Sequence, residues 1–228
     1  SRPSSPPTMV GVDVGGTFTD VVAVHDGRLT TAKVPTTVDD QSRAVVDGVL
    51  TALRSAGLDP GDVDHFIHGM TVGTNALLEG RGARTSLVTT EGFADLLHLR
   101  RQTRAHLYRL DARHPPALVP RERSHEVTEG CAPEGVVTPL DEGSLERVVE
   151  AVRRDRAEAV ALGFLFSFAH PDHERRAAER LRRELPGVHV SASREVLPEI
   201  GGCGLLSAPA VDAYLTPVLR RYLERVGA

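Results

Sequence analysis

Tryptophan is absent from this 228-residue sequence, and lysine occurs once, at Lys33. Aromatic residues make up only 4% of the chain, which argues against stacking platforms for the bases of single-stranded nucleic acid. No G-x-x-x-x-G-K-[ST] segment is present, so the sequence excludes a P-loop NTPase. Lysine Schiff-base chemistry would have to use Lys33, and its strand-like context in residues 30–34 gives no sign of it.

Cysteine and long apolar runs are scarce as well. Cys131 and Cys203 lie far apart without C-x-x-C spacing, so we expect two thiols in a reducing cytoplasm. No apolar run reaches membrane-spanning length, and no signal-peptide pattern opens the chain, so we expect a cytoplasmic protein without membrane contact. The net charge of −4 gives no reason to expect a nucleic-acid partner. Residues 1–8 are rich in proline and serine and are expected to form a flexible leader.

The regular part of the chain alternates between strand and helix patterns. Residues 91–139 have mixed polarity and several prolines, and we expect an irregular insertion there within a domain covering residues 9–228. Expected strands lie at 9–14, 20–24, 29–34, 65–68, 85–90, 124–128, 159–164 and 188–193. Helices are expected over about 45–56, 74–79, 145–152, 172–185 and 211–226, the first ended by Gly57 and the last kinked by, or starting at, Pro217.

The most informative segment is a glycine pair set between acids and threonines. The strands at 9–14 and 20–24 are predicted to join through a tight turn at Gly15 and Gly16. Such a turn exposes backbone N–H groups, and nearby hydroxyls and carboxylates complete what a magnesium triphosphate requires. An ordinary surface hairpin is the alternative, because short glycine motifs also recur by chance. The candidate phosphate ligands are Gly15, Gly16, Thr17 and Thr19, with carboxylates from Asp13 and Asp20.

Several segments together carry a family resemblance. Asp-Val-Gly-Gly-Thr-Phe-Thr-Asp at 13–20 resembles the first phosphate loop of the hydantoinase A / 5-oxoprolinase family. His-Gly-Met-Thr-Val-Gly-Thr-Asn-Ala-Leu-Leu at 68–78 is similar to that family's HGTTVATNALL segment. Shorter matching segments follow in order at 89–93, 99–102, 118–123 and 213–215, so the resemblance covers essentially residues 9–226.

The resemblance implies an α/β fold of the actin-like ATPase (ribonuclease H-like) type, in its N-terminal half, with a mixed sheet flanked by helices. It implies ATP and Mg²⁺ as cofactors, with Asp13 as the metal ligand. It also implies a substrate that is a cyclic amide, such as a hydantoin, oxoproline or another lactam, and whose carbonyl is phosphorylated. A subunit of a ketone carboxylase is the alternative enzyme, and a non-catalytic binding or scaffold module that keeps the fold is the alternative outside catalysis.

The resemblance also suggests the remaining site residues. His68 is expected to act at the activated carbonyl together with Asp13 and Asp20, while Thr71, Thr74 and Asn75 contact the substrate. Spacing alone leaves open that Thr71 or Thr74 only caps a helix. Departures from the family pattern are Met70, Gly73, Arg109 and the glycine-rich segment 201–209.

Only one D-x-G-G-T segment occurs, so the chain corresponds to the family's N-terminal region. We expect the missing half to be supplied in cis or by a second subunit. The last helix carries an apolar stripe, and we expect part of it to be exposed and to mediate self-association or binding of a partner chain. The stripe consists of Val211, Tyr214, Leu215, Val218, Leu219, Tyr222 and Val226.

Two further patterns are interpreted as structural. His170 and His173 have a spacing that metal sites use, but Pro171 between them favours the start of a helix. Cys203 lies among glycines with no base identifiable beside it, which argues against a nucleophile.

Overall fold

The structure is a computed structural model that describes residues 6–37, 40–99, 116–197 and 204–226. The chain divides into two compact units, which we describe separately. Unit 1 comprises Ser1–Gly80 and Leu219–Ala228, and unit 2 comprises Arg81–Val218. The predictions that concern Arg109, Cys203, the glycines at 201–202 and the first five residues lie outside the described residues.

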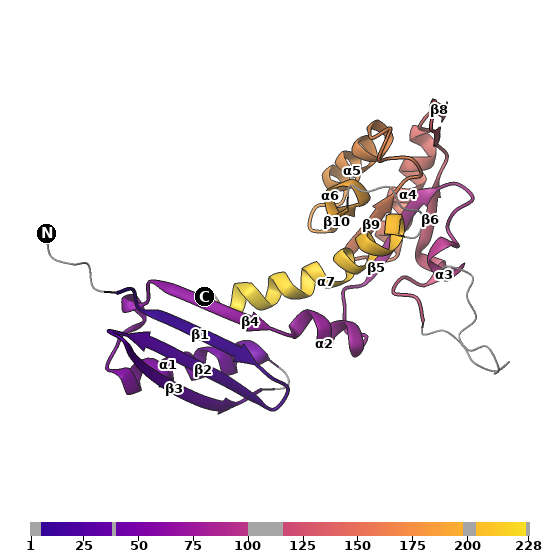
Figure 1. The fold of residues 1–228 in the computed structure, drawn as a ribbon. Helices are drawn as coiled ribbons and strands as arrows, with labels where there is room; N and C mark the ends of the chain where they lie inside the picture. Colours follow the sequence, from indigo (N-terminus) through magenta and orange to yellow (C-terminus); the bar gives the residue numbers. More distant parts are fainter. Residues whose placement is uncertain (1–5, 38–39, 100–115, 198–203, 227–228) are drawn as a thin grey trace, which may run out of the picture. The chain divides into compact units, whose positions relative to one another are not determined.

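Unit 1 is built on a four-stranded mixed sheet in the order β3-β2-β1-β4 (Figure 1). β1 pairs antiparallel with β2 and parallel with β4, and β2 pairs antiparallel with β3. The bounds are β1 Met9–Val14, β2 Phe18–His25, β3 Arg28–Pro35 and β4 His65–Met70. The order β-β-β-α-β that the sequence pattern predicted is confirmed.

Helix α1 (Gln41–Ala56) covers one face of this sheet (Figure 1). Asp40 caps its first turn by accepting a hydrogen bond from the Ser42 amide, and Gly57 ends it in the left-handed conformation that glycine adopts without steric cost. A Cβ at Gly48 would lie 2.7 Å from a methyl group of Val21, so a glycine here lets the helix approach the sheet closely. A 3₁₀ turn (Pro60–Asp62) precedes β4, and α2 (Val72–Leu78) follows it, beginning two residues before the expected start.

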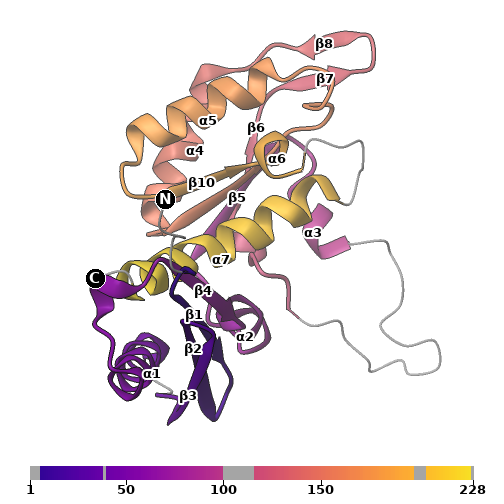
Figure 2. The ribbon, with the colours of Figure 1, turned by 60° about the vertical axis from the view of Figure 1, so that its left-hand side comes forward.

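Unit 2 contains a second four-stranded sheet, in the order β10-β9-β5-β6, whose strands all run parallel. Helices α4 and α5 cover one face, and residues 204–218 of α7 pack on the other (Figure 2). Because both faces are covered, β5 and β9 are buried along their whole length. The bounds are β5 Thr85–Thr90, β6 Ser124–Val127, β9 Ala159–Gly163, β10 His189–Ala192, α4 Glu142–Arg154, α5 Asp172–Glu184 and α7 Gly204–Val226.

The region expected to be an irregular insertion holds more regular structure than the sequence suggested. The strand predicted at 124–128 is present as β6, and it pairs with β5 as a member of the sheet. It is followed by an antiparallel hairpin of β7 (Gly130–Ala132) and β8 (Gly135–Thr138). The other short elements of unit 2 are α3 (Leu96–Leu99), a 3₁₀ turn (Arg121–Arg123) and α6 (Ser193–Val196).

Helix α7 differs from its prediction at its start. It begins at Gly204 and continues through Pro209 and Pro217, so Pro217 does not mark the start of the helix. Its apolar stripe is less exposed than expected: Tyr214 and Tyr222 are buried, and the other five residues of the stripe are partly buried. The exposed apolar side chains of unit 1 include Phe66 and Ile67 on β4 instead.

Within the described part of the chain, no helix is both long enough and apolar enough to span a membrane.

Candidate functional site

The loop between β1 and β2 is closed by its own backbone. The Gly15 amide donates a hydrogen bond to the Phe18 carbonyl at 3.0 Å, and a Cβ at Gly15 would lie 2.9 Å from that same oxygen. A larger residue at this position would therefore push the loop apart. Gly16 is different, because nothing lies within 4 Å of the place where its Cβ would be. The loop thus has one glycine that closes it and one with open space beside it.

Thr36, which follows β3, supports the loop through two hydrogen bonds. Its hydroxyl donates to the Gly15 carbonyl at 2.9 Å, and its amide donates to the Thr17 carbonyl at 2.9 Å. The amides of Gly16 and Thr17 donate no hydrogen bond to another of the described residues. Two N–H groups on a fixed loop, both free to donate, are an arrangement that binds anions.

The exposed face of the unit 1 sheet carries a row of charged side chains next to this loop. The register pairs Asp13 with Asp20 and with Gly69, and it pairs Asp20 with Lys33. Paired residues on neighbouring strands point to the same face, so one row runs across all four strands. Val12, Val14 and Val21 alternate with this row and are buried on the face that α1 covers.

The two carboxylates of the row have different surroundings. Asp20 forms an ion pair with Lys33 at 2.9 Å, and the Lys33 ammonium lies 5.2 Å from the centre of the Phe18 ring. No hydrogen bond or ion pair joins Asp13 to another of the described residues. Asp13 is exposed and has its oxygens available, which is the state that a carboxylate ligand of Mg²⁺ needs.

The residues at the start of α2 that were predicted to contact the substrate lie at the same edge of the unit 1 sheet as the loop of Gly15 and Gly16. β1 and β4 are parallel and end together, with Val14 paired to Met70, so the residues after each strand are neighbours. The Thr71 hydroxyl donates to the Val14 carbonyl at 3.2 Å, and the side-chain amide of Asn75 (Nδ2) donates to the Thr71 hydroxyl at 3.3 Å. Thr71 occupies the N-cap position of α2 but makes no side-chain cap bond, so its hydroxyl is used to tie the two segments together. Thr74 is exposed.

Thr19 lies elsewhere than the sequence suggested. It pairs with Val14 and points to the buried face, where its side chain is 0% exposed. Its hydroxyl lies 3.0 Å from the hydroxyl of Thr36, so it supports the residue that holds the loop. The expectation that Thr19 offers a hydroxyl to phosphate overlooked the strand alternation, which turns it away from Asp13 and Asp20.

His68 also lies on the face away from the row. It pairs with the buried Val12, whereas the next residue, Gly69, pairs with Asp13. His68 stacks on Tyr222 of α7 with ring centres 5.6 Å apart, and its Nε2 lies 2.6 Å from the tyrosine hydroxyl. Both belong to unit 1, where His68 lines an apolar hollow of about 550 Å³ between α1, β4 and the end of α7. Burial lowers the pKa of His68, so the ring is neutral at pH 7.

Lys33 and Thr36 are the residues of this site that the sequence analysis missed. Nothing in the local sequence pattern around Lys33 distinguishes it. The signal was its uniqueness as the only lysine, combined with a hairpin that places it opposite Asp20. Thr36 gave no local signal, since its hydroxyl bonds to a residue 21 positions earlier in the chain.

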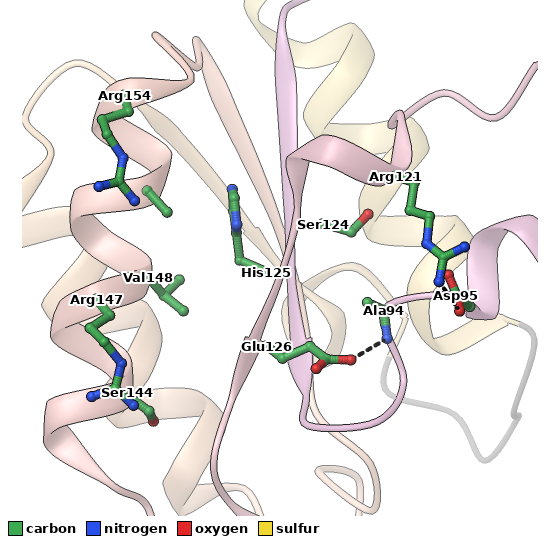
Figure 3. A pocket seen from close by; sticks show the side chains of 11 residues that line it. Ala94, Asp95, Arg121, Ser124, His125, Glu126, Ser144, Arg147, Val148 and Arg154 are labelled. Atoms are coloured by element: carbon green, nitrogen blue, oxygen red, sulfur yellow. Dashed lines mark hydrogen bonds and ion pairs between the residues drawn. The ribbon is translucent and has the colours of Figure 1, made fainter.

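Unit 2 has a polar hollow of about 480 Å³ between α4, β6 and the loop at 94–95 (Figure 3). The acids at its wall are already engaged: Glu126 accepts from the amides of Gly92 and Ala94, and Asp95 pairs with Arg121 at 2.8 Å. Beside it, Asp155 accepts from Ser86 at 2.7 Å and lies 2.6 Å from His125 Nε2. Both groups bond to the carboxylate and not to each other, so this is not a nucleophile–base arrangement. None of the predicted site residues lies here.

Comparison with known proteins identifies relatives along the whole chain. The profile of the hydantoinase/oxoprolinase N-terminal region matches residues 9–185. The alpha subunit of caprolactamase from Pseudomonas jessenii is 36% identical over 96% of this chain, which spans 33% of that subunit. The gamma subunit of acetophenone carboxylase from Aromatoleum aromaticum is 32% identical over 90% of this chain and 31% of its own length. The 5-oxoprolinase of Saccharomyces cerevisiae is 29% identical over 96% of this chain and 20% of its own length.

Solved structures agree with this result. The crystal structure of ATP-dependent caprolactamase from Pseudomonas jessenii superposes with a TM-score of 0.86 over 96% of this chain and 33% of its own chain. Nucleotide-free acetone carboxylase gives a TM-score of 0.83 at 22% identity, over 97% of this chain and 34% of its own, which shows the shared fold. The mixed α/β fold of actin-like ATPase type predicted from the sequence is confirmed. The chain spans about a third of the first of these relatives, and it belongs to the hydantoinase/oxoprolinase N-terminal family.

Proposed function

We propose that unit 1 binds the phosphates of MgATP at the loop of Gly15, Gly16 and Thr17. We further propose that the chain is the N-terminal part of an ATP-dependent enzyme that acts on a cyclic amide. The observation that carries the proposal is the meeting of three features at one edge of the sheet. These are the loop amides and the Asp13 carboxylate, which have no hydrogen-bond partner among the described residues, and the polar start of α2.

The donor set fits a magnesium triphosphate on chemical grounds. A triphosphate needs N–H donors and positive charge, which the loop amides and Lys33 offer, and Mg²⁺ prefers oxygen ligands such as Asp13. Lys33 pairs with Asp20 on the exposed face, which places its ammonium beside the row. Bound ATP supplies the phosphoryl group that activates a carbonyl oxygen of the substrate.

The residues of the chain then have separate parts in the proposal. Gly16 and Thr17 bind phosphate oxygens through their amides, and Asp13 holds the metal. Thr71, Thr74 and Asn75 orient the substrate at the same edge. A proton-transfer role for His68 stays a prediction, and the surroundings of His68 favour a positioning role, because its ring is neutral and bonded to Tyr222.

One alternative enzyme has specific support, and the non-catalytic module stays a second hypothesis. The 32% identity to an acetophenone carboxylase subunit favours a ketone as the substrate class. A binding or scaffold module would keep the fold without turnover. The rest of the active site is proposed to come from further residues in cis or from a second subunit, because the chain spans about a third of its caprolactamase relative.

Nuclear magnetic resonance with MgATP tests the binding proposal on the chain itself. We expect millimolar MgATP to shift the amide signals of Gly16 and Thr17, with a dissociation constant weaker than micromolar because one phosphate loop makes few contacts. Asp13→Asn should weaken the magnesium-dependent affinity for ATP by about tenfold or more, which equals about 1.4 kcal/mol of binding free energy. Asp47→Asn, on the exposed side of α1, is the control with the same charge change and should leave the shifts unaltered.

Turnover tests the substrate class in the full-length protein that carries this chain. ADP release should depend on a cyclic amide such as caprolactam, 5-oxoproline or hydantoin, and not on acetophenone with bicarbonate. Release that depends on the ketone would make the carboxylase the correct assignment. Loop amides that do not respond to MgATP would contradict the site itself and favour the scaffold module.

A further inference from the structure

Three metal-ligating side chains of different kinds meet in unit 2, outside the proposed ATP site. They are Glu129, between β6 and β7, Cys131 on β7, and His173 in the first turn of α5. We call them the Glu-Cys-His cluster. Of the two histidines in the His-Pro-Asp-His segment, only His173 belongs to the cluster. The Nε2 of His170 instead lies 3.3 Å from the Pro133 carbonyl.

The donor atoms of the cluster already have the spacing of a metal site. Nδ1 of His173 lies 2.9 Å from a carboxylate oxygen of Glu129 and 3.8 Å from Sγ of Cys131, and all three donor atoms lie within 4.8 Å of one another. A tetrahedral zinc ion with bonds of about 2.0–2.3 Å places neighbouring donors roughly 3.3–3.6 Å apart. Shifts of a few tenths of an ångström in the two measured separations would give that geometry.

Burial distinguishes this cluster from a chance group of surface residues. The exposed fractions are 4% for Glu129, 9% for Cys131 and 7% for His173. No arginine or lysine among the described residues pairs with Glu129, so its only partner that can carry positive charge is His173, and only when that ring is protonated. A buried carboxylate without a fixed cation is costly.

We propose that the Glu-Cys-His cluster is a binding site for one divalent transition-metal ion, with Zn²⁺ as the ion that fits best. A carboxylate oxygen, an imidazole nitrogen and a thiolate form a mixed set that suits Zn²⁺, whereas Mg²⁺ and Ca²⁺ prefer oxygen ligands alone. The site is therefore distinct in both place and chemistry from the magnesium ligand of unit 1. Three protein ligands leave a fourth position for water.

Binding balances charge without any redox change. The thiol of Cys131 loses its proton to solvent as the S–metal bond forms, and His173 coordinates through Nδ1 with its proton on Nε2. One carboxylate, one thiolate and one dication then sum to zero. This replaces a buried negative charge by a neutral group, which removes the cost described above.

The location of the cluster supports a ligand site. Glu129 follows β6 closely, and Thr90, the last residue of β5, donates its hydroxyl to Glu129. Thr90 in turn accepts a hydrogen bond from the Leu165 amide at 3.0 Å, so its orientation is fixed. In parallel α/β sheets, ligands bind beyond the carboxyl ends of the strands. Thr90 is a positioning residue that orients the Glu129 carboxylate.

Cobalt titration of the metal-free 228-residue chain tests the proposal. We expect one equivalent of Co²⁺ to produce visible d–d bands of tetrahedral coordination and a near-ultraviolet thiolate-to-cobalt band, both removed by competing Zn²⁺. Cys131→Val should abolish the thiolate band and weaken binding by more than 100-fold. Thr90→Val should weaken binding by about 10–100-fold while the thiolate band persists.

Two matched variants control for the other candidate ligands. Cys203→Ser changes the second cysteine, and His170→Gln changes the neighbouring histidine, and both should leave the bands and the stoichiometry unchanged. Circular dichroism checks that Cys131→Val is folded. If it is not, the wild-type melting temperature must rise with Zn²⁺ and fall with EDTA for the proposal to stand. A wild-type chain without a 1:1 complex, or a thiolate band that survives Cys131→Val, would overturn it.

Discussion

Unit 1 and unit 2 both place carboxylates near the ends of parallel strands, but the two carboxylates differ in burial and in the hydrogen bonds that they accept. In unit 1, Asp13 is exposed and has no partner among the described residues. In unit 2, Glu174 is 1% exposed, and its carboxylate accepts from the Phe164 amide, the Arg194 amide and the Ser193 hydroxyl. A carboxylate with all its hydrogen bonds made holds the fold, whereas one with none is free to bind an exchangeable ligand.

The largest expected effect on stability comes from removing the Glu174 carboxylate, whose hydrogen bonds are all made. Glu174→Ala leaves the buried Phe164 amide, the partly buried Arg194 amide and the buried Ser193 hydroxyl without this acceptor and should lower the free energy of unfolding by about 3 kcal/mol or more. Urea denaturation of the chain measures the loss. Glu179→Ala on the exposed side of the same helix should change stability by less than about 0.5 kcal/mol. Equal losses in the two variants would show that Glu174 is not a structural carboxylate.

The two glycines of the unit 1 loop should separate stability from binding. Gly15→Ala places a methyl group 2.9 Å from the Phe18 carbonyl and should cost about 1–3 kcal/mol. Gly16→Ala meets nothing within 4 Å and does not have a positive φ to strain, so it should change stability by about 0.5 kcal/mol or less. It should nevertheless weaken the MgATP shifts, because the methyl group enters the space in front of the loop. Unchanged shifts in Gly16→Ala would place the phosphates elsewhere.

A smaller effect is expected where β4 is tied to α7 within unit 1. Tyr222→Phe removes the hydroxyl that bonds His68 and should cost about 0.5–1.5 kcal/mol. Tyr214→Phe is the matched control: it too is buried, and its hydroxyl bonds to no other described residue, so its loss should be close to zero. Denaturation midpoints of the two variants give the comparison. A cost in Tyr214→Phe as large as in Tyr222→Phe would mean that burial matters here and not the hydrogen bond.

The smallest effect is a pH dependence from His68. Burial lowers its pKa in the folded state below the ordinary value of 6.5, so the unfolded chain binds more protons in this range. The contribution of His68 to stability is therefore complete above about pH 6.5 and is lost as the pH falls toward the folded pKa. The free energy of unfolding should decline less between pH 7 and 5 in His68→Phe than in the wild type. Identical slopes would show that the ring titrates normally in the fold.

Local pattern was enough to place most of the elements. The apolar alternation at Met9–Val14, the complete apolar run of β9 and the left-handed glycine after α1 each act within a few residues. The end of α7 was predicted for the same reason, whereas its start at Gly204 was not, because a glycine-rich stretch carries no helical periodicity. The membership of β6 in the unit 2 sheet was likewise invisible, since it depends on pairing with a strand more than 30 residues earlier.

The site could be predicted in composition but only partly in geometry. Asp13, Gly15, Gly16 and Thr71 are gathered at one edge as expected, because β1 and β4 end together. Which face each strand residue uses depends on register, and a difference of one residue places His68 and Gly69 on opposite faces. The same alternation turned Thr19 inward and brought Lys33 beside Asp20.

The sequence by itself determined the family, the order of most strands and helices along the chain and the residue types of the candidate phosphate loop, because these follow from short-range patterns and motifs. Only the tertiary structure decided which side chains meet. Asp13 and Lys33 come to one face across three strands, and Glu129 comes to His173 across 44 residues. The physical reason is that charge and hydrogen-bond satisfaction depend on burial and strand register, and both are set by packing between segments distant in the chain.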